Sequence, residues 1–145
     1  MFGTNDLRLF AIDARTGKQC ARFGNGGVVA LPPSKPEFSR GEVQHMAPPA
    51  IINDVVVLGS AIGDNKRVDT PSGKVQAFSA KDGRRLWEFE PIPKSPDDPA
   101  YRTWGEDGPL NVGSSNVWSN MAVDEDRDIV FLPVSTPAPD NYGGN

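Results

Sequence analysis

The residue types that most often carry out nucleophilic and metal chemistry are scarce in this chain. Cys20 is the single cysteine and His45 the single histidine among 145 residues. A lone cysteine forms no internal disulfide and no cysteine-rich zinc site, and one histidine gives no multi-histidine metal site and little basis for a Ser-His-Asp triad. We therefore expect Cys20 to be a small buried residue and His45, in the loop VQHMAPP, to be a surface or packing residue.

The composition is typical of a soluble globular protein with one domain or a piece of one. The 145 residues carry a net charge of −4, and 37% of them are hydrophobic. A negative chain without clustered Lys and Arg argues against nucleic acid as a partner, because phosphate backbones are bound by such clusters. The longest aliphatic run, VVVL at 55–58, is far shorter than the roughly 20 apolar residues of a membrane-spanning helix. The first residues, MFGTND, lack the basic and apolar regions of an export signal.

Two stretches of the chain repeat one another. LFAIDARTGKQCARF at 9–23 aligns with VQAFSAKDGRRLWEF at 75–89, and their turn glycines, Gly17 and Gly83, are 66 residues apart. Each copy reads as a short strand, a glycine turn and a second short strand, with Gly where a positive φ costs least. A repeat of this kind indicates an architecture of stacked copies of one unit.

The strands expected at these turns are apolar on both faces. In LRLFAID, Leu9 and Ala11 fall on one face while Phe10 and Ile12 fall on the other, which is the period of two of a strand. Strands that are apolar on both sides belong between packed layers rather than at a solvent face. Two further hairpins are predicted, AIINDVVVLGS at 50–60 and MAVDEDRDIVFLPVS at 121–135.

The order of these units predicts an all-β fold that is a fragment of a β-propeller with four-stranded antiparallel blades. A corner hairpin at about 1–25 ends one blade, a full blade spans about 48–91, and the start of the next lies at about 120–136. Repeated four-stranded units are what a propeller stacks around its axis. An unrelated β-sandwich is an alternative that fits the number of strands but not the repeat.

The corner that ends in Trp87 points to a family. AFSAKDGRRLW at 77–87 resembles the tryptophan-docking motif of the eight-bladed quinoprotein dehydrogenases, in which the indole lies across the neighbouring blade, whereas the copy at 11–21 has Ala21 in that place. Most of the chain further resembles the membrane-bound glucose dehydrogenase-like branch of that family. The matching blocks are GSAIGDN at 59–65, PSGKVQAFSAKDGRRLWEFEP at 71–91, SSNVWSNMAVDEDRDIVFLPVSTP at 114–137 and PDNYGGN at 139–145.

The resemblance implies a cofactor, pyrroloquinoline quinone (PQQ), and a metal ion, Ca²⁺ or Mg²⁺. Trp118 of SSNVW matches the tryptophan that forms the floor under the quinone ring, although a core-packing role for Trp118 is the alternative. Asp64 and Asn65 of GDN match the residues that face the metal, and both carry the oxygen donors that a hard cation requires. An ordinary Asx turn is the alternative for these two residues. The next oxygen donor of the family falls on Ala138, so Ser135 or Thr136 would have to substitute.

The resemblance also implies an oxidoreductase that oxidises a glucose-like aldose or an alcohol and passes electrons to a respiratory quinone or cytochrome. The family's aspartate base lies outside the matched stretch, so we expect no catalytic residue in this chain and no turnover by the chain without the remaining propeller blades. The expected location is the periplasm or the periplasmic face of the inner membrane. A non-enzymatic quinoprotein-like propeller scaffold for protein interaction is the alternative function.

Overall fold

The chain forms small antiparallel sheets with almost no helix. The computed structural model describes residues 1–31, 41–63, 67–105, 109 and 112–140. Within these ranges the only helix is the short 3-10 helix η1 (Tyr101–Trp104), and none is long and apolar enough to cross a bilayer. The all-β prediction is confirmed. The strands are β1 (Phe2–Thr4), β2 (Arg8–Phe10), β3 (Val28–Ala30), β4 (Val43–Gln44), β5 (Ala50–Ile52), β6 (Val55–Leu58), β7 (Ala61–Ile62), β8 (Val75–Ser79), β9 (Arg85–Phe89), β10 (Ala122–Asp124) and β11 (Ile129–Phe131).

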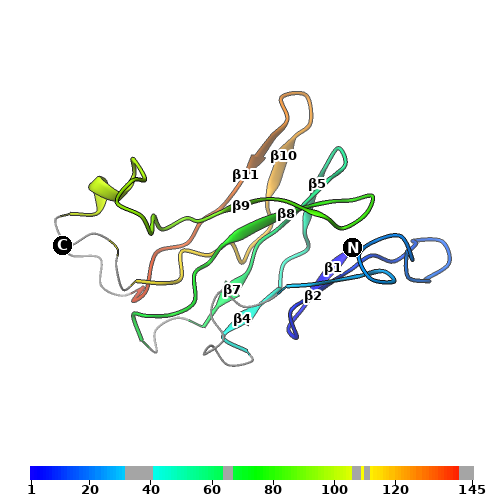
Figure 1. Ribbon diagram of the computed structural model, residues 1–145, viewed down its shortest axis with the longest axis horizontal. Coiled ribbons are helices and arrows are strands. Elements are labelled where there is room, and N and C mark those ends of the chain that lie inside the picture. Colours follow the sequence, from blue (N-terminus) through cyan, green and yellow to red (C-terminus); the bar gives the residue numbers. More distant parts are fainter. Residues whose placement is uncertain (32–40, 64–66, 106–108, 110–111, 141–145) are drawn as a thin grey trace.

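A four-stranded antiparallel sheet lies at the centre of the described structure. Its strand order is β5-β6-β8-β9, so each strand pairs with its neighbour along the chain apart from the short β7. A three-stranded sheet, β1-β2-β3, lies on one side and the hairpin β10-β11 on the other, while β4 pairs with β7. Figure 1 shows these sheets following one another along the molecule. Both hairpins predicted from the sequence, at 50–60 and 121–135, are present.

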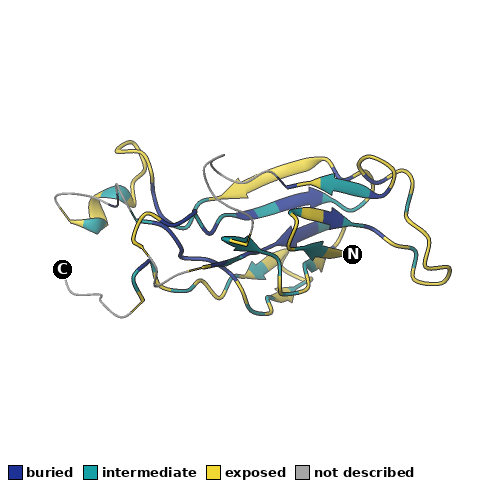
Figure 2. Ribbon diagram, turned by 90° about the horizontal axis from the view of Figure 1, so that it is seen from below, coloured by how far each residue is buried: buried dark blue, intermediate teal, exposed yellow. Residues whose placement is uncertain are grey.

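Both faces of the central sheet are buried at its inner strands, β6 and β8, as the alternation of the sequence predicts. Val56 and Leu58 of β6, with Phe78 of β8, pack against the β1-β2-β3 sheet, whose contributions include Leu9 and Leu31. On the opposite face Val57, Val75 and Ala77 form a second cluster with Val117, and partly buried residues of the β11 side, Val130 and Leu132, join it. Figure 2 shows the buried strands in the interior between more exposed ones. The sandwich alternative is therefore wrong, because a central sheet covered on both faces makes three layers.

The two glycine corners share one hydrogen-bond pattern, which confirms the repeat. The Gly17 N–H donates to Asp13 O at 2.9 Å, and the Gly83 N–H donates to Ser79 O at 2.9 Å. Both glycines have a positive φ, 70° and 74°. In the first corner the Asp13 carboxylate also accepts hydrogen bonds from the Thr16 hydroxyl and from the N–H groups of Arg15 and Thr16. These bonds lower the pKa of Asp13, and the bond from the Thr16 hydroxyl is the largest cause.

The strand expected directly after the first corner is not formed there. Ile12 and Gln19 make only an isolated bridge, and regular pairing with β2 resumes at β3, after a loop through residues 20–27. The loop is folded inward because the ring of Phe23 is buried at 1% exposure in the first core. Cys20 packs against the same core but is only partly buried, rather than buried as expected.

The tight turns and the long loops lie at opposite ends of the central sheet and of the hairpin beside it. Because antiparallel strands alternate in direction, the 53–54, 80–84 and 125–128 turns gather at one end, where Asn53 Nδ2 donates to Asp128 Oδ1 at 2.6 Å. The 59–74 and 90–121 connections leave from the other end. Figure 1 shows the turns of these sheets toward the upper right and the connections toward the lower left. The described segments next to the candidate residues, 59–63 and 113–118, therefore belong to connections at one end.

Trp87 is partly exposed within the described structure. It lies on β9, the edge strand, opposite Ala77 of β8, and its side chain is 40% exposed. All positions of β9 are exposed, which Figure 2 shows as a yellow outer strand. The hairpin β10-β11 covers the sheet from the β5 side and does not extend over β9. A neighbouring blade over Trp87, as the docking motif implies, is therefore not formed by the described residues.

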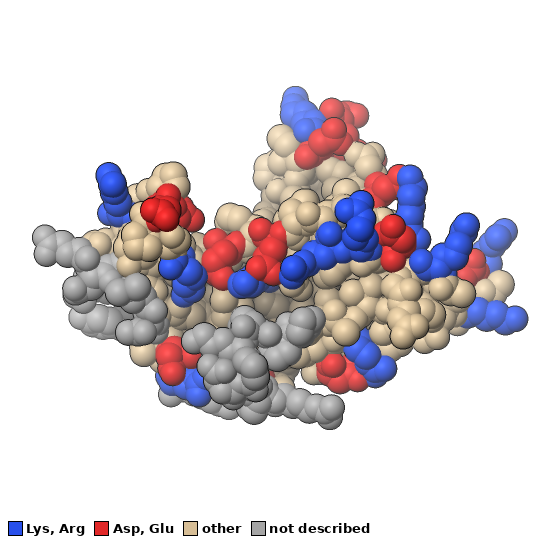
Figure 3. Space-filling view, viewed as in Figure 1, with Lys and Arg blue, Asp and Glu red and all other residues tan. Residues whose placement is uncertain are grey.

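Charged side chains of both signs lie interspersed on the surface. Figure 3 shows acidic and basic groups next to one another over the face drawn there, rather than in separate patches. Several of them form exposed ion pairs, for example Lys81 with Asp54 and Arg127 with Asp124, both at 2.7 Å. Exposed pairs of this kind contribute little to stability, about 0–1 kcal/mol each.

Candidate functional site

The segment of residues 113–118 forms the centre of the candidate site. It is the part of the 90–121 connection that enters the interior, where Ser114, Asn116 and Val117 are each at most 2% exposed. Trp118 follows directly and is 58% exposed. A large indole is thus presented to solvent by a backbone that is fully enclosed.

Two glycines allow the segment to lie close to the central sheet. A Cβ atom at Gly59 would lie 2.3 Å from Val117 O, and one at Gly73 would lie 2.4 Å from Asn116 Cα. No side chain fits at these distances, and the nearest atom in each case belongs to the backbone. Gly59 and Gly73 are therefore needed for the close approach of the segment to both ends of the 59–74 connection.

The side chain of Asn116 joins three parts of the chain. Its Nδ2 donates to Ser60 O at 3.0 Å, and its Oδ1 accepts the Ser135 hydroxyl at 3.0 Å. The backbone N–H of Asn116 donates back to Ser135 Oγ at 3.0 Å, and the Ser135 N–H donates to Asn116 O at 3.0 Å. We call Ser60, Asn116 and Ser135 the Asn116 hub. The hub fixes the position of the backbone two residues before Trp118.

Ser114 and Ser115 hold the segment in an unusual backbone conformation. Both have a positive φ, 64° and 51°, which costs free energy for residues other than glycine and persists only where the surroundings fix it. The Ser114 hydroxyl lies 3.0 Å from the Thr70 hydroxyl, and the Ser115 N–H donates to Thr136 O at 3.1 Å. Strained positions of this kind cluster at ligand sites, which marks the segment as a candidate site independently of the tryptophan.

The structure brings together parts of two of the four blocks singled out in the sequence. Residues 59–63, 113–118 and 132–138 meet at the Asn116 hub, and Trp118 lies exposed beside them. The predicted metal residues, Asp64 and Asn65, lie outside the described residues, although Ser60 of the hub is only four positions before Asp64. Among the described residues no group of three or more His, Cys, Asp or Glu side chains could hold a metal ion.

The position expected to supply a further oxygen donor has none. Ala138 is 4% exposed and packs as a small apolar residue. Of the two substitutes, Ser135 donates its hydroxyl to Asn116, while the Thr136 hydroxyl donates to Asp140 Oδ1 at 3.1 Å. Thr136 is exposed and its hydroxyl oxygen keeps acceptor capacity.

His45 supports the same connection from the opposite side. Its Nδ1 lies 2.8 Å from Gly59 O, the carbonyl that precedes the one held by Asn116. Burial lowers the pKa of His45 from its ordinary value of 6.5, and the hydrogen bond to Gly59 acts in the opposite direction without outweighing burial. His45 is thus a packing residue, which was one of the two roles expected for it. In addition, His45 and Asn116 bind successive carbonyls of the 59–74 connection.

We expect His45 to make the fold sensitive to mild acid. Since the folded pKa is lower than the unfolded value of 6.5, the unfolded chain binds more protons in the window just below that value, and stability falls as the pH falls through it. Thermal unfolding of the full-length protein at about pH 7.5 and about pH 5.5 tests this. The midpoint should fall less for His45→Gln than for the wild type, and an equal fall in both would contradict the assignment.

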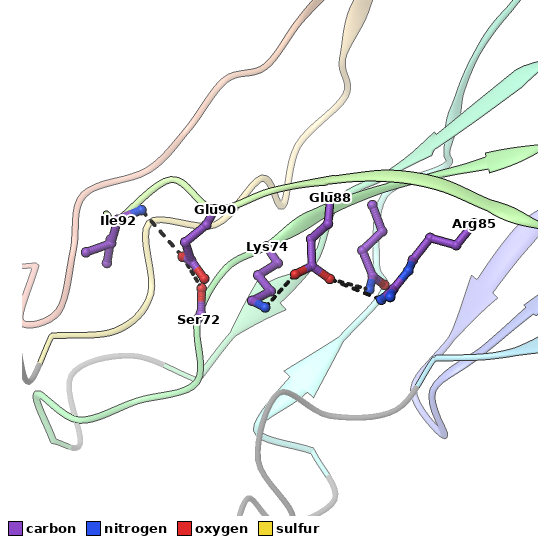
Figure 4. Close-up of polar contacts among 7 residues, drawn as sticks. Ser72, Lys74, Arg85, Glu88, Glu90 and Ile92 are labelled. Carbon is purple, nitrogen blue, oxygen red and sulfur yellow. Dashed lines mark hydrogen bonds and ion pairs between the residues drawn. The ribbon is translucent and has the colours of Figure 1, made fainter. Parts of the chain in front are cut away.

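A polar network on β8 and β9 borders the same end of the molecule. Glu88 accepts hydrogen bonds from Lys74, Gln76 and Arg85, and Ser72 donates to Glu90. Figure 4 shows Lys74 and Arg85 reaching toward Glu88 from the two sides. Burial acts to raise the pKa of Glu88, but the bonds from Lys74 and Gln76 outweigh it and the pKa is lowered.

The network lines a cavity between the central sheet and the β1-β2-β3 sheet. The cavity holds about 240 Å³, and its apolar lining residues are Leu7, Leu31 and Val43. Every buried side-chain nitrogen and oxygen of the described residues has a hydrogen-bond partner. Both cations that line the cavity, Lys74 and Arg85, pair with the same carboxylate, that of Glu88.

Neither the Asn116 hub nor the role of His45 is evident from the sequence. The polar run SSN before Val117 could have marked buried polar residues, because polar side chains directly before an apolar pair are unusual in a strand-rich chain. Their partners, however, are a backbone carbonyl 56 positions away and a hydroxyl 19 positions away. No local pattern specifies such contacts.

Comparison with known proteins assigns relatives to the whole length of the chain. Residues 1–145 match the family described as glucose/ethanol/alcohol dehydrogenase, beta-propeller domain. The chain is 34% identical over 145 residues to a quinoprotein glucose dehydrogenase of Gluconobacter oxydans (strain 621H), covering 97% of this chain and 17% of that protein. It is 35% identical over 140 residues to the glycerol dehydrogenase large subunit of Gluconobacter thailandicus, covering 97% of this chain and 18% of that protein.

Solved structures share the fold. A quinohemoprotein alcohol dehydrogenase from Pseudomonas putida HK5 superposes with a TM-score of 0.67 at 22% identity, over 92% of this chain and 19% of that chain. The corresponding enzyme from Comamonas testosteroni gives a TM-score of 0.63 at 21% identity, with the same coverage of 92% and 19%. The 145 residues thus span less than a fifth of the length of these similar proteins.

Proposed function

The chain belongs to the glucose/ethanol/alcohol dehydrogenase β-propeller family, and on this premise we propose that it supplies part of the PQQ site of an oxidoreductase for a sugar or an alcohol. In this proposal the sheet β5-β6-β8-β9 is one blade, β1-β2-β3 ends the blade before it and β10-β11 begins the blade after it. The remaining blades of the full-length protein would complete the ring.

The exposed indole on a buried segment is the observation that supports this proposal best. Trp118 is 58% exposed, whereas the four residues before it are at most 4% exposed. A flat aromatic face binds a planar cofactor by stacking without needing hydrogen bonds. Because the segment is already ordered, little conformational freedom is lost when a ligand stacks on it. We propose that Trp118 forms the floor under the quinone ring. The exposure of its indole also disfavours the alternative of a core tryptophan.

We further propose that Asp64 and Asn65 face the metal ion, Ca²⁺ or Mg²⁺. Carboxylate and amide oxygens are suitable ligands for either ion. The Asn116 hub and His45 hold the backbone of Gly59 and Ser60, a few positions before these two residues in the sequence. Thr136 is the remaining side chain that could add an oxygen, since Ala138 has none and Ser135 is engaged with Asn116.

When bound, the quinone supplies the hydride-accepting chemistry and the metal acts as a Lewis acid on it. The residues of this chain orient the ring plane and support the backbone that leads to the metal ligands. The aspartate base that takes the substrate proton would come from the part of the full-length protein beyond these blades. Electrons would pass on to a respiratory quinone or cytochrome, in the periplasm or at the periplasmic face of the inner membrane.

Reconstitution tests the proposed function. The full-length protein, purified without cofactor and incubated with PQQ and Ca²⁺, should oxidise an aldose or an alcohol in a dye-linked assay. PQQ without Ca²⁺ serves as the control and should give much less activity. An absence of PQQ binding would contradict the proposal and would favour a propeller that acts as a scaffold for other proteins.

A further inference from the structure

The Asn116 hub combines features that a purely structural contact would not need. Asn116 uses a donor and an acceptor of the same side chain on two different parts of the chain, Ser60 and Ser135. Its exposed fraction is 2%, so water cannot replace either partner. Only an amide places an N–H and a C=O at the end of so short a side chain.

The residues of the hub are close in sequence both to the proposed cofactor floor and to the proposed metal ligands. Trp118 is two positions after Asn116, and Asp64 is four positions after Ser60. Gly59 and Gly73 bring the backbones of these parts within contact distance, with no room for a side chain between them. A movement of Asn116 would therefore shift Trp118 relative to the 59–74 connection.

We infer that Asn116 is a positioning residue for PQQ binding, which acts through Trp118 by fixing the backbone that carries the indole relative to Ser60. The inference rests on the proposed function. Asn116 itself is buried and does not touch the cofactor. Its contribution is the same kind of support that outer residues give to metal ligands, whose loss costs about 10–100-fold in affinity or activity.

Asn116→Asp is the sharpest test, because the change is nearly isosteric. The new carboxylate keeps an acceptor for the Ser135 hydroxyl but has no N–H for Ser60 O, and it brings a negative charge beside that carbonyl oxygen. We expect PQQ to bind the full-length variant about tenfold more weakly or worse, measured as the dissociation constant from quenching of protein fluorescence in Ca²⁺. Ser135→Ala removes two hydrogen bonds of the hub, the one that the hydroxyl donates to Asn116 Oδ1 and the one that it accepts from the Asn116 N–H. It should weaken PQQ binding about fivefold.

A matched control separates positioning from loss of stability. Val56→Ala opens a cavity in the core on the opposite face of the central sheet, where Val56 is fully buried in the cluster that does not include Val117. This variant should unfold at a lower temperature than the wild type and yet bind PQQ with unchanged affinity when measured well below that temperature. Ser135→Ala provides the test if Asn116→Asp does not fold.

A double-mutant cycle shows whether Asn116 acts through the indole. In a Trp118→Ala background, Asn116→Asp should weaken PQQ binding by less than about twofold more, because the group that it positions is gone. Wild-type affinity in both Asn116→Asp and Ser135→Ala, or full additivity with Trp118→Ala, would overturn the inference and leave the proposed function intact. Failure of the wild-type protein to bind PQQ would overturn both.

Discussion

Replacing Trp118 by alanine should weaken the binding of PQQ to the full-length protein by about 10- to 100-fold, because an aromatic stacking surface worth about 1.4–2.8 kcal/mol is lost. The same change should shift the thermal midpoint very little. Trp118 is 58% exposed, and substitutions of exposed side chains change stability by about 0.5 kcal/mol. Titration of the cofactor-free protein with PQQ, followed by absorbance, measures the first effect, and a thermal melt measures the second.

Two further variants make the Trp118 result specific. Trp118→Phe keeps an aromatic face of smaller area and should bind PQQ with an affinity between those of the wild type and the alanine variant. Trp104→Ala removes the indole of η1, outside the Asn116 hub, and should leave PQQ affinity unchanged. Equal losses of PQQ affinity and of stability in Trp118→Ala would show instead that Trp118 is a packing residue.

Gly73→Ala should be the most destabilising of the small substitutions considered for this chain. Its Cβ would lie 2.4 Å from Asn116 Cα and 2.6 Å from Asn116 N, so either backbone must move. Overpacking of this kind costs about 1–3 kcal/mol, and the displaced segment leads to Trp118. We expect a midpoint lowered by several degrees, together with weaker PQQ binding, measured by a thermal melt and by PQQ titration.

Gly63→Ala is the matched control for Gly73→Ala. No described atom lies within 4 Å of the position of a Cβ at Gly63, and its φ is not in the left-handed region. The same added methyl group should therefore leave the thermal midpoint close to that of the wild type. A midpoint for Gly73→Ala that equals the one for Gly63→Ala would contradict the close packing of the 113–118 segment on the central sheet.

The layered fold could be predicted from the sequence because it depends on local patterns. Alternation of apolar residues in VVVL sends Val56 and Leu58 to one core and Val57 to the other. The glycine corners could be recognised because Gly17 and Gly83 adopt the positive φ that only glycine takes at low cost. The loop after the first corner, residues 20–27, could not be predicted, because it depends on the burial of Phe23 against residues that are distant in the sequence.

The candidate site could be predicted only in part. Resemblance to a family selects Trp118, and the structure adds that the indole is exposed on an enclosed segment. The contacts that hold it could not be foreseen, because Asn116 pairs with a carbonyl 56 positions away in the sequence. His45 likewise has no sequence pattern that names Gly59 as its partner. Asp64 and Asn65 lie outside the described residues, so their part remains a prediction.

A structure of the full-length protein with PQQ and Ca²⁺ bound tests most directly whether residues 113–118 form the platform of the cofactor site. We expect the plane of the Trp118 indole to lie against the plane of the quinone rings, with Asn116 still bonded to Ser60 and Ser135 beneath it. A quinone bound elsewhere in the protein, or one bound near residues 113–118 without contact to the indole, would contradict the proposal that this segment is the platform of the cofactor site.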